Sequence, residues 1–156
     1  MPVRSAGILL HRRRGGGIEV LLVHPGGPLW ARRDEHAWSI PKGEYDASEE
    51  PLAAARREFT EELGSPPPDG PFEELGEVRQ KSGKRVLAWA ATGDLDATAA
   101  HSSTFQLEWP PRSGRRIEVP EIDRAQWFGL EEARRRINQA QAELIDRLEA
   151  RLGAAS

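Results

Sequence analysis

Residues 43–65 read GEYDASEEPLAAARREFTEELGS, and the spacing of the acidic residues in this stretch decides the fold. Glu58, Glu61 and Glu62 stand at positions i, i+3 and i+4, so a helix places their carboxylates on one stripe. Like charges at this spacing destabilise an isolated helix, and a stripe of three therefore calls for a cation. Ligands that offer only oxygen favour a hard cation such as Mg²⁺ or Mn²⁺. Taken alone, such a cluster also fits a solvated acidic helix face.

The ends of this helix are marked in the sequence. Pro51 has the fixed φ that suits a first helical turn, and Gly64 is a typical residue to end one. The three prolines at 66–68 prevent any continuation. Apolar residues recur between the two ends at helical spacing and predict a face that packs against a sheet: Leu52, Ala55, Phe59 and Leu63.

The full pattern resembles the signature of the Nudix hydrolases, G-x5-E-x7-R-E-U-x-E-E-x-G-U, in which U is a bulky apolar residue. We call residues 43–65 the box. Its matching residues are Gly43, Glu49, Arg57, Glu58, Phe59, Glu61, Glu62 and Gly64. Ser65 departs from the pattern, but it follows the helix and carries no carboxylate. This many fixed residue types at fixed spacing seldom arise by chance.

Short apolar runs separated by turn signals predict the α/β class, with a mixed β-sheet packed by helices. The resemblance sharpens this prediction to the Nudix fold, an α/β/α sandwich with a loop–helix–loop catalytic motif, in a single domain spanning 1–156. Besides the box helix at 51–64 we expect residues 130–137 and 138–152 to form one long helix or two consecutive helices. A short extended piece is expected at 38–41. The expected strands are 6–11, 18–24, 72–80, 85–92, 104–109 and 126–128.

Composition excludes several classes of protein. The formal net charge of −3 gives no polycationic footprint, so we expect no binding of extended nucleic acid. The chain has no cysteine, which removes disulfides and zinc–thiolate sites. No stretch approaches the ~20 apolar residues of a membrane span. We therefore expect a cytoplasmic protein with no membrane contact; its oligomeric state is left open.

The resemblance implies roles for the residues of the box. Glu58 and Glu62, with Glu61 close behind, are the expected metal ligands, and the carbonyl of Gly43 is expected to join them. Arg57 is expected to grip a carboxylate with two hydrogen bonds and so to orient it. The expected metal is Mg²⁺, with Mn²⁺ as the alternative.

Two glutamates are candidates for the general base that activates water. Glu61 is the candidate inside the box, and its position is fixed by the motif. Glu121 is the candidate outside it, in the acidic stretch 118–123 that we interpret as a loop, with Glu118 behind it. A general base must first satisfy geometry, so the sequence leaves both open, with Glu61 slightly favoured.

Four basic residues are candidates for phosphate binding. Lys42 directly precedes the box, and Arg32, Arg33 and Lys84 are the candidates for a rim that attracts phosphate. The tetrapeptide at 41–44, Pro-Lys-Gly-Glu, resembles the branch of the family that acts on dinucleoside polyphosphates and diphosphoinositols. Against this, the dinucleoside branch often has a base-stacking tyrosine past the box. The only tyrosine here is Tyr45, inside it.

We therefore expect a metal-dependent enzyme that hydrolyses a diphosphate linkage, an acid anhydride of phosphorus, in a small nucleotide derivative. A dinucleoside polyphosphate or a nucleoside triphosphate is the leading substrate. One alternative is a pyrophosphohydrolase that removes oxidised purine nucleotides. A second is a catalytically silent Nudix module that binds a nucleotide or a protein, although such a module would be expected to have lost box carboxylates.

Overall fold

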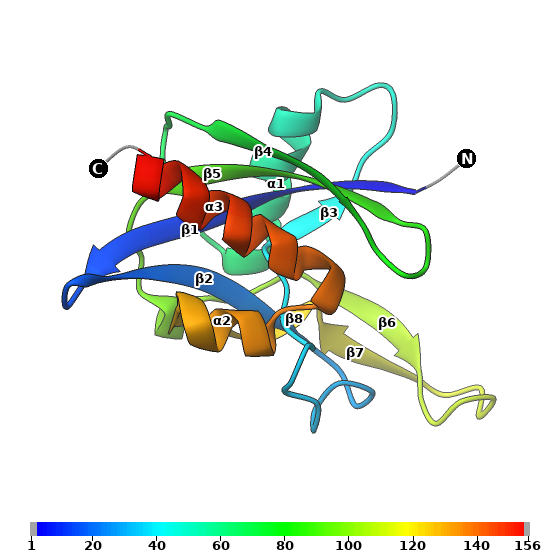
Figure 1. Ribbon diagram of the computed structural model, residues 1–156. Helices are drawn as coiled ribbons and strands as arrows, with labels where there is room; N and C mark the ends of the chain where they lie inside the picture. The colour runs from blue at the N-terminus through cyan, green and yellow to red at the C-terminus, as the bar shows by residue number, and fades with distance from the viewer. Residues whose placement is uncertain (1–2, 155–156) are drawn as a thin grey trace.

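The computed structural model describes residues 3–154, which form a main sheet, a separate two-stranded ribbon and helices on both faces of the sheet (Figure 1). The strands of the main sheet are β1 (Arg4–Arg14), β2 (Gly17–Pro25), β3 (Lys42–Glu44), β4 (Glu73–Arg79), β5 (Arg85–Thr92) and β8 (Ile122–Gly129). The ribbon consists of β6 (Thr104–Glu108) and β7 (Arg116–Pro120). The helices are α1 (Pro51–Leu63), α2 (Leu130–Arg136) and α3 (Ala142–Ala154), with 3₁₀ turns η1 (Ala97–Ala99) and η2 (Gln139–Gln141).

The sheet is mixed, with strand order β4-β5-β1-β2-β8. Only the β1–β5 pair is parallel among the described pairs, and the chain between these two strands contains α1. β1 pairs with β2 near its C-terminal end and with β3 near its N-terminal end, from Ser5 to Gly7. Residues 38–41 lie between β1 and β2, where Ile8 donates to the Pro41 carbonyl and Ser39 exchanges two hydrogen bonds with Val23. Because residues 38–41 are bonded to both strands, they place Gly43, the first residue of the box, beside β1.

Two apolar clusters cover the two faces of the sheet. Side chains alternate along a strand, so in β1 Leu9 joins one cluster while Ile8 and Leu10 join the other. The first cluster packs against α2 and α3, and the second packs against α1 through Phe59 and Leu63. Each large aliphatic side chain buried in this way contributes about 1.5–3 kcal/mol. The predicted sandwich of helices around a mixed sheet is confirmed.

The box helix has the predicted ends. α1 begins at Pro51 and ends at Leu63, and the Gly64 amide donates to the Thr60 carbonyl at 2.8 Å. Gly64 has a φ of 75°, a left-handed conformation that glycine adopts without strain. Within residues 3–154, no helix combines the length and apolar character needed to cross a membrane.

The structure corrects one prediction near the C-terminal part of the sheet. The stretch 118–123 is not a loop, because β7 ends at Pro120 and β8 begins at Ile122. Glu118 therefore lies on a strand, and only Glu121 stands between the two. The short strand predicted at 126–128 is the end of the longer β8. The strand predicted at 104–109 is confirmed as β6, but the sequence pattern does not reveal its partner β7.

Candidate active site

The box loop and α1 meet at Gly43 and Glu58. Gly43 is held on β3 opposite Ala6, and Glu58 is buried on α1 beside the core residue Phe59. A Cβ atom at position 43 would lie 1.9 Å from the carboxylate carbon of Glu58. Carbon atoms in ordinary contact are ~3.5–4.0 Å apart, so no larger residue fits here unless Glu58 moves. The glycine of the box therefore lets the backbone reach a buried carboxylate.

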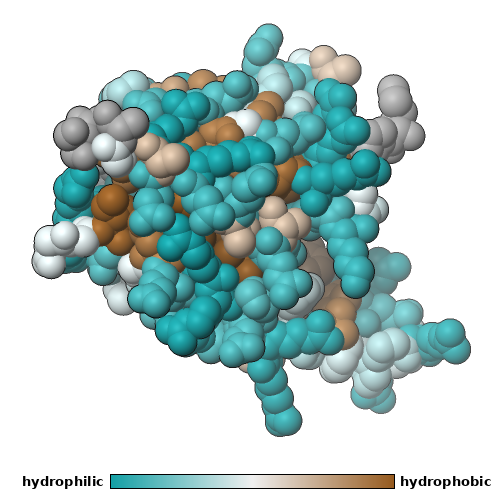
Figure 2. All heavy atoms as spheres, in the orientation of Figure 1, coloured by the Kyte–Doolittle hydropathy of each residue, from teal (hydrophilic) through white to brown (hydrophobic). Residues whose placement is uncertain are grey.

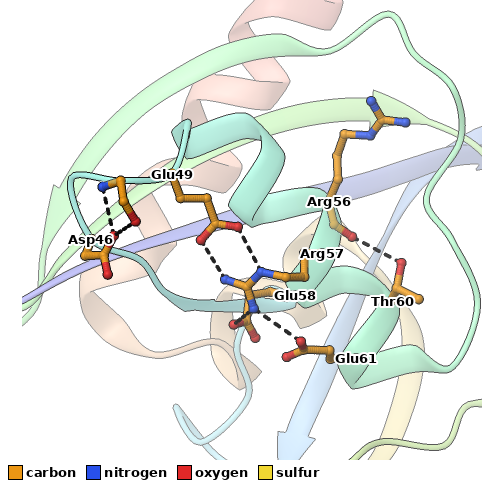
Figure 3. A network of polar contacts seen from close by, with 8 residues as sticks. Asp46, Glu49, Arg56, Arg57, Glu58, Thr60 and Glu61 are labelled. Atoms are coloured by element: carbon orange, nitrogen blue, oxygen red, sulfur yellow. Dashed lines mark hydrogen bonds and ion pairs between the residues drawn. The ribbon is translucent and has the colours of Figure 1, made fainter.

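Arg57 gathers three carboxylates of the box (Figure 3). Its Nε and Nη2 donate to the two oxygens of Glu49 at 2.9 Å each. Its Nη1 donates to Glu58 at 2.8 Å and to Glu61 at 3.2 Å. The bonds from Arg57 hold the pKa of Glu49 below its usual range, and the same bonds raise the pKa of Arg57. The predicted bidentate grip falls on Glu49, and a single nitrogen orients the other two carboxylates.

Lys42 and Glu62 form a second part of the site. The Lys42 amide donates to a carboxylate oxygen of Glu62 at 3.1 Å. Burial is the main cause that raises the pKa of Glu62, and it also lowers the pKa of Lys42, with the nearby Lys84 adding to that effect. Lys84 in turn lies 4.0 Å from Glu44. The structure thus brings Lys42 and Lys84 together next to a carboxylate of the box.

Glu121 joins the box across a long stretch of sequence. Its amide donates to the Ser103 carbonyl at 2.9 Å, and the Ser103 amide donates to the Glu61 carbonyl at 3.0 Å. Burial raises the pKa of Glu121, and the charge of Glu61 raises it further. The charge of Glu121 contributes in the same way to the raised pKa values of Glu58 and Glu62. Four carboxylates are therefore close enough to repel one another.

Ser102 is a residue of this site that sequence reasoning missed. Its Oγ accepts from the Ile122 amide at 3.1 Å and donates to the Ser103 carbonyl at 2.9 Å. The residue before it, His101, donates its amide to the Leu63 carbonyl at the end of α1. Residues 101–103 therefore fasten the β7–β8 junction to the box helix. No sequence motif marks this segment, because its bonds are mostly made by the backbone.

The donor set of the site fits a divalent cation. The site gathers five carboxylates, Glu49, Glu58, Glu61, Glu62 and Glu121, against the three basic side chains of Arg57, Lys42 and Lys84. The donors are oxygen atoms, which suit Mg²⁺ or Mn²⁺. Within residues 3–154, no three acidic or histidine side chains already enclose a point where an ion would sit. A cation held by these carboxylates would require their side chains to move.

Arg32 and Arg33 lie apart from this group, in the loop 26–37 between β2 and β3. The guanidinium of Arg33 lies over the ring of Trp30, 5.4 Å from the ring centroid. The backbone carbonyl oxygen of Arg33 contacts Nε2 of His24 at 2.5 Å. His24 also contacts Asp123 at 2.9 Å. Among the described residues, neither arginine is bonded to a carboxylate of the box. The predicted rim therefore does not form as one group: Lys84 lies beside Lys42, whereas Arg32 and Arg33 lie elsewhere, in the loop 26–37.

The geometry and the motif agree with the comparison to known families, in which the model described as NUDIX domain matches residues 1–148. This chain belongs to the Nudix family. The predicted family is confirmed, and solved structures of Nudix proteins share the fold. The Ap4A hydrolase of Caenorhabditis elegans in a binary complex superposes with a TM-score of 0.69 at 24% identity, covering 97% of this chain and 98% of that one. The Nudix domain of Shewanella oneidensis NrtR, complexed with ADP ribose, superposes with a TM-score of 0.65 at 16% identity, covering 97% and 89%.

Curated relatives with similar sequences are enzymes of phosphate chemistry. An RNA pyrophosphohydrolase of Halorhodospira halophila is 31% identical over 112 residues, which are 64% of this chain and 57% of the relative. An asymmetrical bis(5′-nucleosyl)-tetraphosphatase of Caenorhabditis elegans is 39% identical over 62 residues, 40% of this chain and 41% of the relative. The matches thus span about half the length of these relatives. Their names agree with the predicted class of enzyme, hydrolases of phosphorus-containing anhydrides.

Proposed function

We propose that this Nudix protein hydrolyses a diphosphate linkage in a nucleotide derivative and depends on a divalent cation. The observation that carries the proposal is the contact of Gly43 with the buried Glu58 carboxylate inside a complete box. Burying a carboxylate beside others of like charge costs free energy, and a bound cation offsets that cost. A silent binding module has no need for this arrangement.

The metal ligands that we propose are Glu58 and Glu62, assisted by Glu61 and the carbonyl of Gly43. Mg²⁺ is the proposed ion, with Mn²⁺ as the alternative. When bound, the ion neutralises charge on the phosphate oxygens and lowers the pKa of the attacking water. Arg57 keeps Glu58 and Glu61 oriented through its hydrogen bonds at 2.8 and 3.2 Å.

We propose Glu121 as the general base, with Glu61 as the alternative. Glu61 is already hydrogen-bonded by Arg57, whereas the carboxylate of Glu121 has no hydrogen bond to another of the described residues. The raised pKa of Glu121 also brings it closer to the working pH, where a base is most effective. This reverses the slight preference drawn from the motif alone.

The proposed substrate is a dinucleoside polyphosphate or a nucleoside triphosphate. Lys42 and Lys84 together offer positive charge beside Glu62, which supports a substrate with several phosphates. The relative named as a tetraphosphatase acts on such a molecule, and the relatives named RNA pyrophosphohydrolase extend the same chemistry to RNA. Oxidised purine nucleotides remain the alternative substrate.

A substrate panel tests the proposal. Purified protein is incubated with Mg²⁺ and with diadenosine tetraphosphate, GTP, an oxidised dGTP and ADP-ribose, and released phosphate and pyrophosphate are measured. We expect turnover of the first two compounds, and loss of that turnover in the matched variant Glu58→Gln. Faster turnover of oxidised dGTP than of GTP would establish the alternative substrate. Tight nucleotide binding without turnover by the wild type would show that the protein is a binding module.

A further inference from the structure

His24 is a fully buried histidine near the end of β2, outside the box. Its ring lies edge-on to Trp38, with the ring centroids 5.1 Å apart, and Trp38 belongs to the cluster that packs against α2 and α3. Figure 2 shows mostly hydrophilic side chains on the outside of that face, whereas the His24 ring has no contact with solvent. Buried polar atoms of this kind need protein partners, because water cannot reach them.

Both ring nitrogens of His24 contact an oxygen atom. Nδ1 lies 2.9 Å from a carboxylate oxygen of Asp123 on β8, and Nε2 lies 2.5 Å from the backbone carbonyl oxygen of Arg33. A carbonyl oxygen can only accept a hydrogen bond. The same Asp123 oxygen also accepts from Nε of Arg124 at 3.4 Å, as an ionised carboxylate does. Each ring nitrogen therefore has to donate, and a histidine donates from both nitrogens only as the charged imidazolium.

Asp123 is the carboxylate that faces this ring. Four other charged side chains come from the elements packed around it, which are β8, the loop 26–37 and α2: Arg124, Arg33, Asp34 and Arg136. Asp34 and Arg136 pair with each other, and the other two guanidinium groups lie over tryptophan rings. Asp123 is therefore the group that offsets the positive charge of the imidazolium.

The two bonds of the His24 ring join segments that are distant in the sequence, and we call them the His24 clamp. One bond reaches β8, and the other reaches the middle of the loop 26–37. Among the described residues, the bond to Arg33 is the only hydrogen bond that residues 28–35 make to β2 or β8. Close to the clamp, the Gly26 amide donates to the Glu121 carbonyl at 3.1 Å. The clamp and the Gly26–Glu121 bond therefore hold the same two segments together.

We propose that His24 is a positioning residue, whose doubly protonated ring fastens the loop 26–37 to the junction of β7 and β8 and so sets the place of Glu121. This inference rests on the proposed function in taking Glu121 as the base, whereas the clamp itself does not depend on that role. His24 makes no hydrogen bond to a carboxylate of the box, so it acts through the backbone around Glu121.

The clamp depends on pH because two acceptors need two protons. When the ring loses one proton, the bond to the Asp123 carboxylate is kept, since a bond to a charged acceptor is the stronger of the two. Nε2 then turns a lone pair toward the Arg33 carbonyl oxygen, and the two atoms repel each other. The clamp therefore holds at low pH and releases the loop 26–37 as the pH rises.

Nitrogen-15 NMR of the histidine rings tests the clamp without any substrate. Spectra are recorded across the titration range of histidine, about pH 5–8, and the signals of His24 are identified by their absence in His24→Gln. We expect both ring nitrogens of His24 to carry a proton at neutral pH, and Nε2 to lose its proton as the pH rises. A His24 ring with a single proton at neutral pH would overturn the proposal.

Hydrogen exchange of the Gly26 amide reports on the backbone bond that holds Glu121. The side chain of His24→Gln has one nitrogen and cannot serve both acceptors, so we expect the protection of this amide to fall about tenfold, the equivalent of one hydrogen bond. Asp123→Asn keeps an acceptor but loses the charge, so we expect wild-type protection at about pH 5 and reduced protection at about pH 8. Because Asp123 is partly exposed, this second variant tests the clamp even if His24→Gln fails to fold.

His36→Gln is the matched control. His36 lies in the same loop, but its Nδ1 contacts one carbonyl oxygen, that of Ile137 at 3.0 Å, so a single proton is enough. We expect this variant to keep the protection of the Gly26 amide and the turnover of the wild type. An equal loss in His36→Gln and His24→Gln would show that any disturbance of the loop has this effect, and it would overturn the proposal.

Turnover tests the link from the clamp to Glu121. We expect kcat of His24→Gln to fall about tenfold or more while KM stays within about twofold, because a fully buried ring positions the base without meeting the substrate. In Asp123→Asn the alkaline limb of the rate–pH profile should move to lower pH. A fall in Gly26 protection with unchanged kcat would leave the clamp standing and overturn Glu121 as the base. If the wild type hydrolyses no nucleotide, the proposed function fails, and the NMR and exchange results still decide the clamp.

Discussion

Replacing Gly43 by alanine tests the closest contact of the site. The new Cβ would lie 1.9 Å from the carboxylate carbon of Glu58 and 2.1 Å from one of its oxygens. Contact at ~3.5 Å requires the carboxylate to move by roughly 1.5 Å. Displacements of ~1 Å in a catalytic group cost about 10²-fold in rate, so we expect kcat/KM to fall by at least about 10²-fold.

The fold should tolerate this substitution. Gly43 is not among the glycines with positive φ, so alanine adds no backbone strain on β3. In a compatible conformation, Gly→Ala even stabilises by about 0.4–1 kcal/mol through the unfolded chain. The Glu58 side chain can turn away at modest cost, and we expect a Tm within a few degrees of the wild type. Loss of activity without loss of structure is the expected combination.

Three measurements on Gly43→Ala test this reasoning. They are steady-state turnover, Mg²⁺ affinity by calorimetry and thermal unfolding. Gly17→Ala is the matched control, because Gly17 begins strand β2 and a Cβ there meets no atom closer than 3.9 Å. Near-native turnover and Mg²⁺ affinity in Gly43→Ala would refute the assignment of Glu58 as a metal ligand. Unfolding of the variant would show that β3 depends on the glycine for structure.

Three further variants address individual roles. Glu58→Gln should cut turnover by more than about 10²-fold and abolish stabilisation by Mg²⁺. Because burial raises the pKa of Glu58, the folded protein binds its proton more tightly than the unfolded chain does, so the metal-free wild type should gain Tm relative to this variant as the pH falls from neutral toward the usual range of a glutamate. Glu121→Gln should remove the acidic limb of the rate–pH profile and lower kcat by about 10²–10⁴-fold. If Glu61→Gln has these effects and Glu121→Gln does not, the base lies inside the box. Lys42→Met should lower kcat/KM more for a dinucleoside tetraphosphate than for a nucleotide sugar, and this difference should shrink at high salt. A loss that is equal for both substrates and independent of salt would mean that Lys42 only shapes the loop.

The box helix could be predicted from the sequence because its determinants are local. Pro51 starts it, Gly64 ends it in a left-handed conformation, and the apolar spacing buries Phe59 and Leu63. Strand β7 could not be predicted in this way. Its five residues, 116–120, alternate charged and apolar side chains as a strand can, but the run is short and ends in proline, and it merges with the acidic stretch 118–123 that we interpreted as a loop.

The partners of the site depend on contacts between distant parts of the chain. Lys84 reaches Lys42 only because β5 pairs with the same strand, β1, that also pairs with β3. Glu121 reaches Glu61 through Ser103, a backbone contact that has no signature in the sequence. Local patterns were therefore enough to propose the metal ligands, whereas our proposal of Glu121 over Glu61 as the base required the fold.

The position of Glu121 depends on three segments that are distant in sequence. Glu121 directly follows β7, its amide donates to the Ser103 carbonyl, and its carbonyl accepts from the Gly26 amide of the loop 26–37. Ser103 in turn donates its amide to the Glu61 carbonyl on the box helix. If Glu121 is the base, as proposed, its distance from the attacking water is set by these backbone bonds and not by any residue of the motif, which is why the motif alone favoured Glu61.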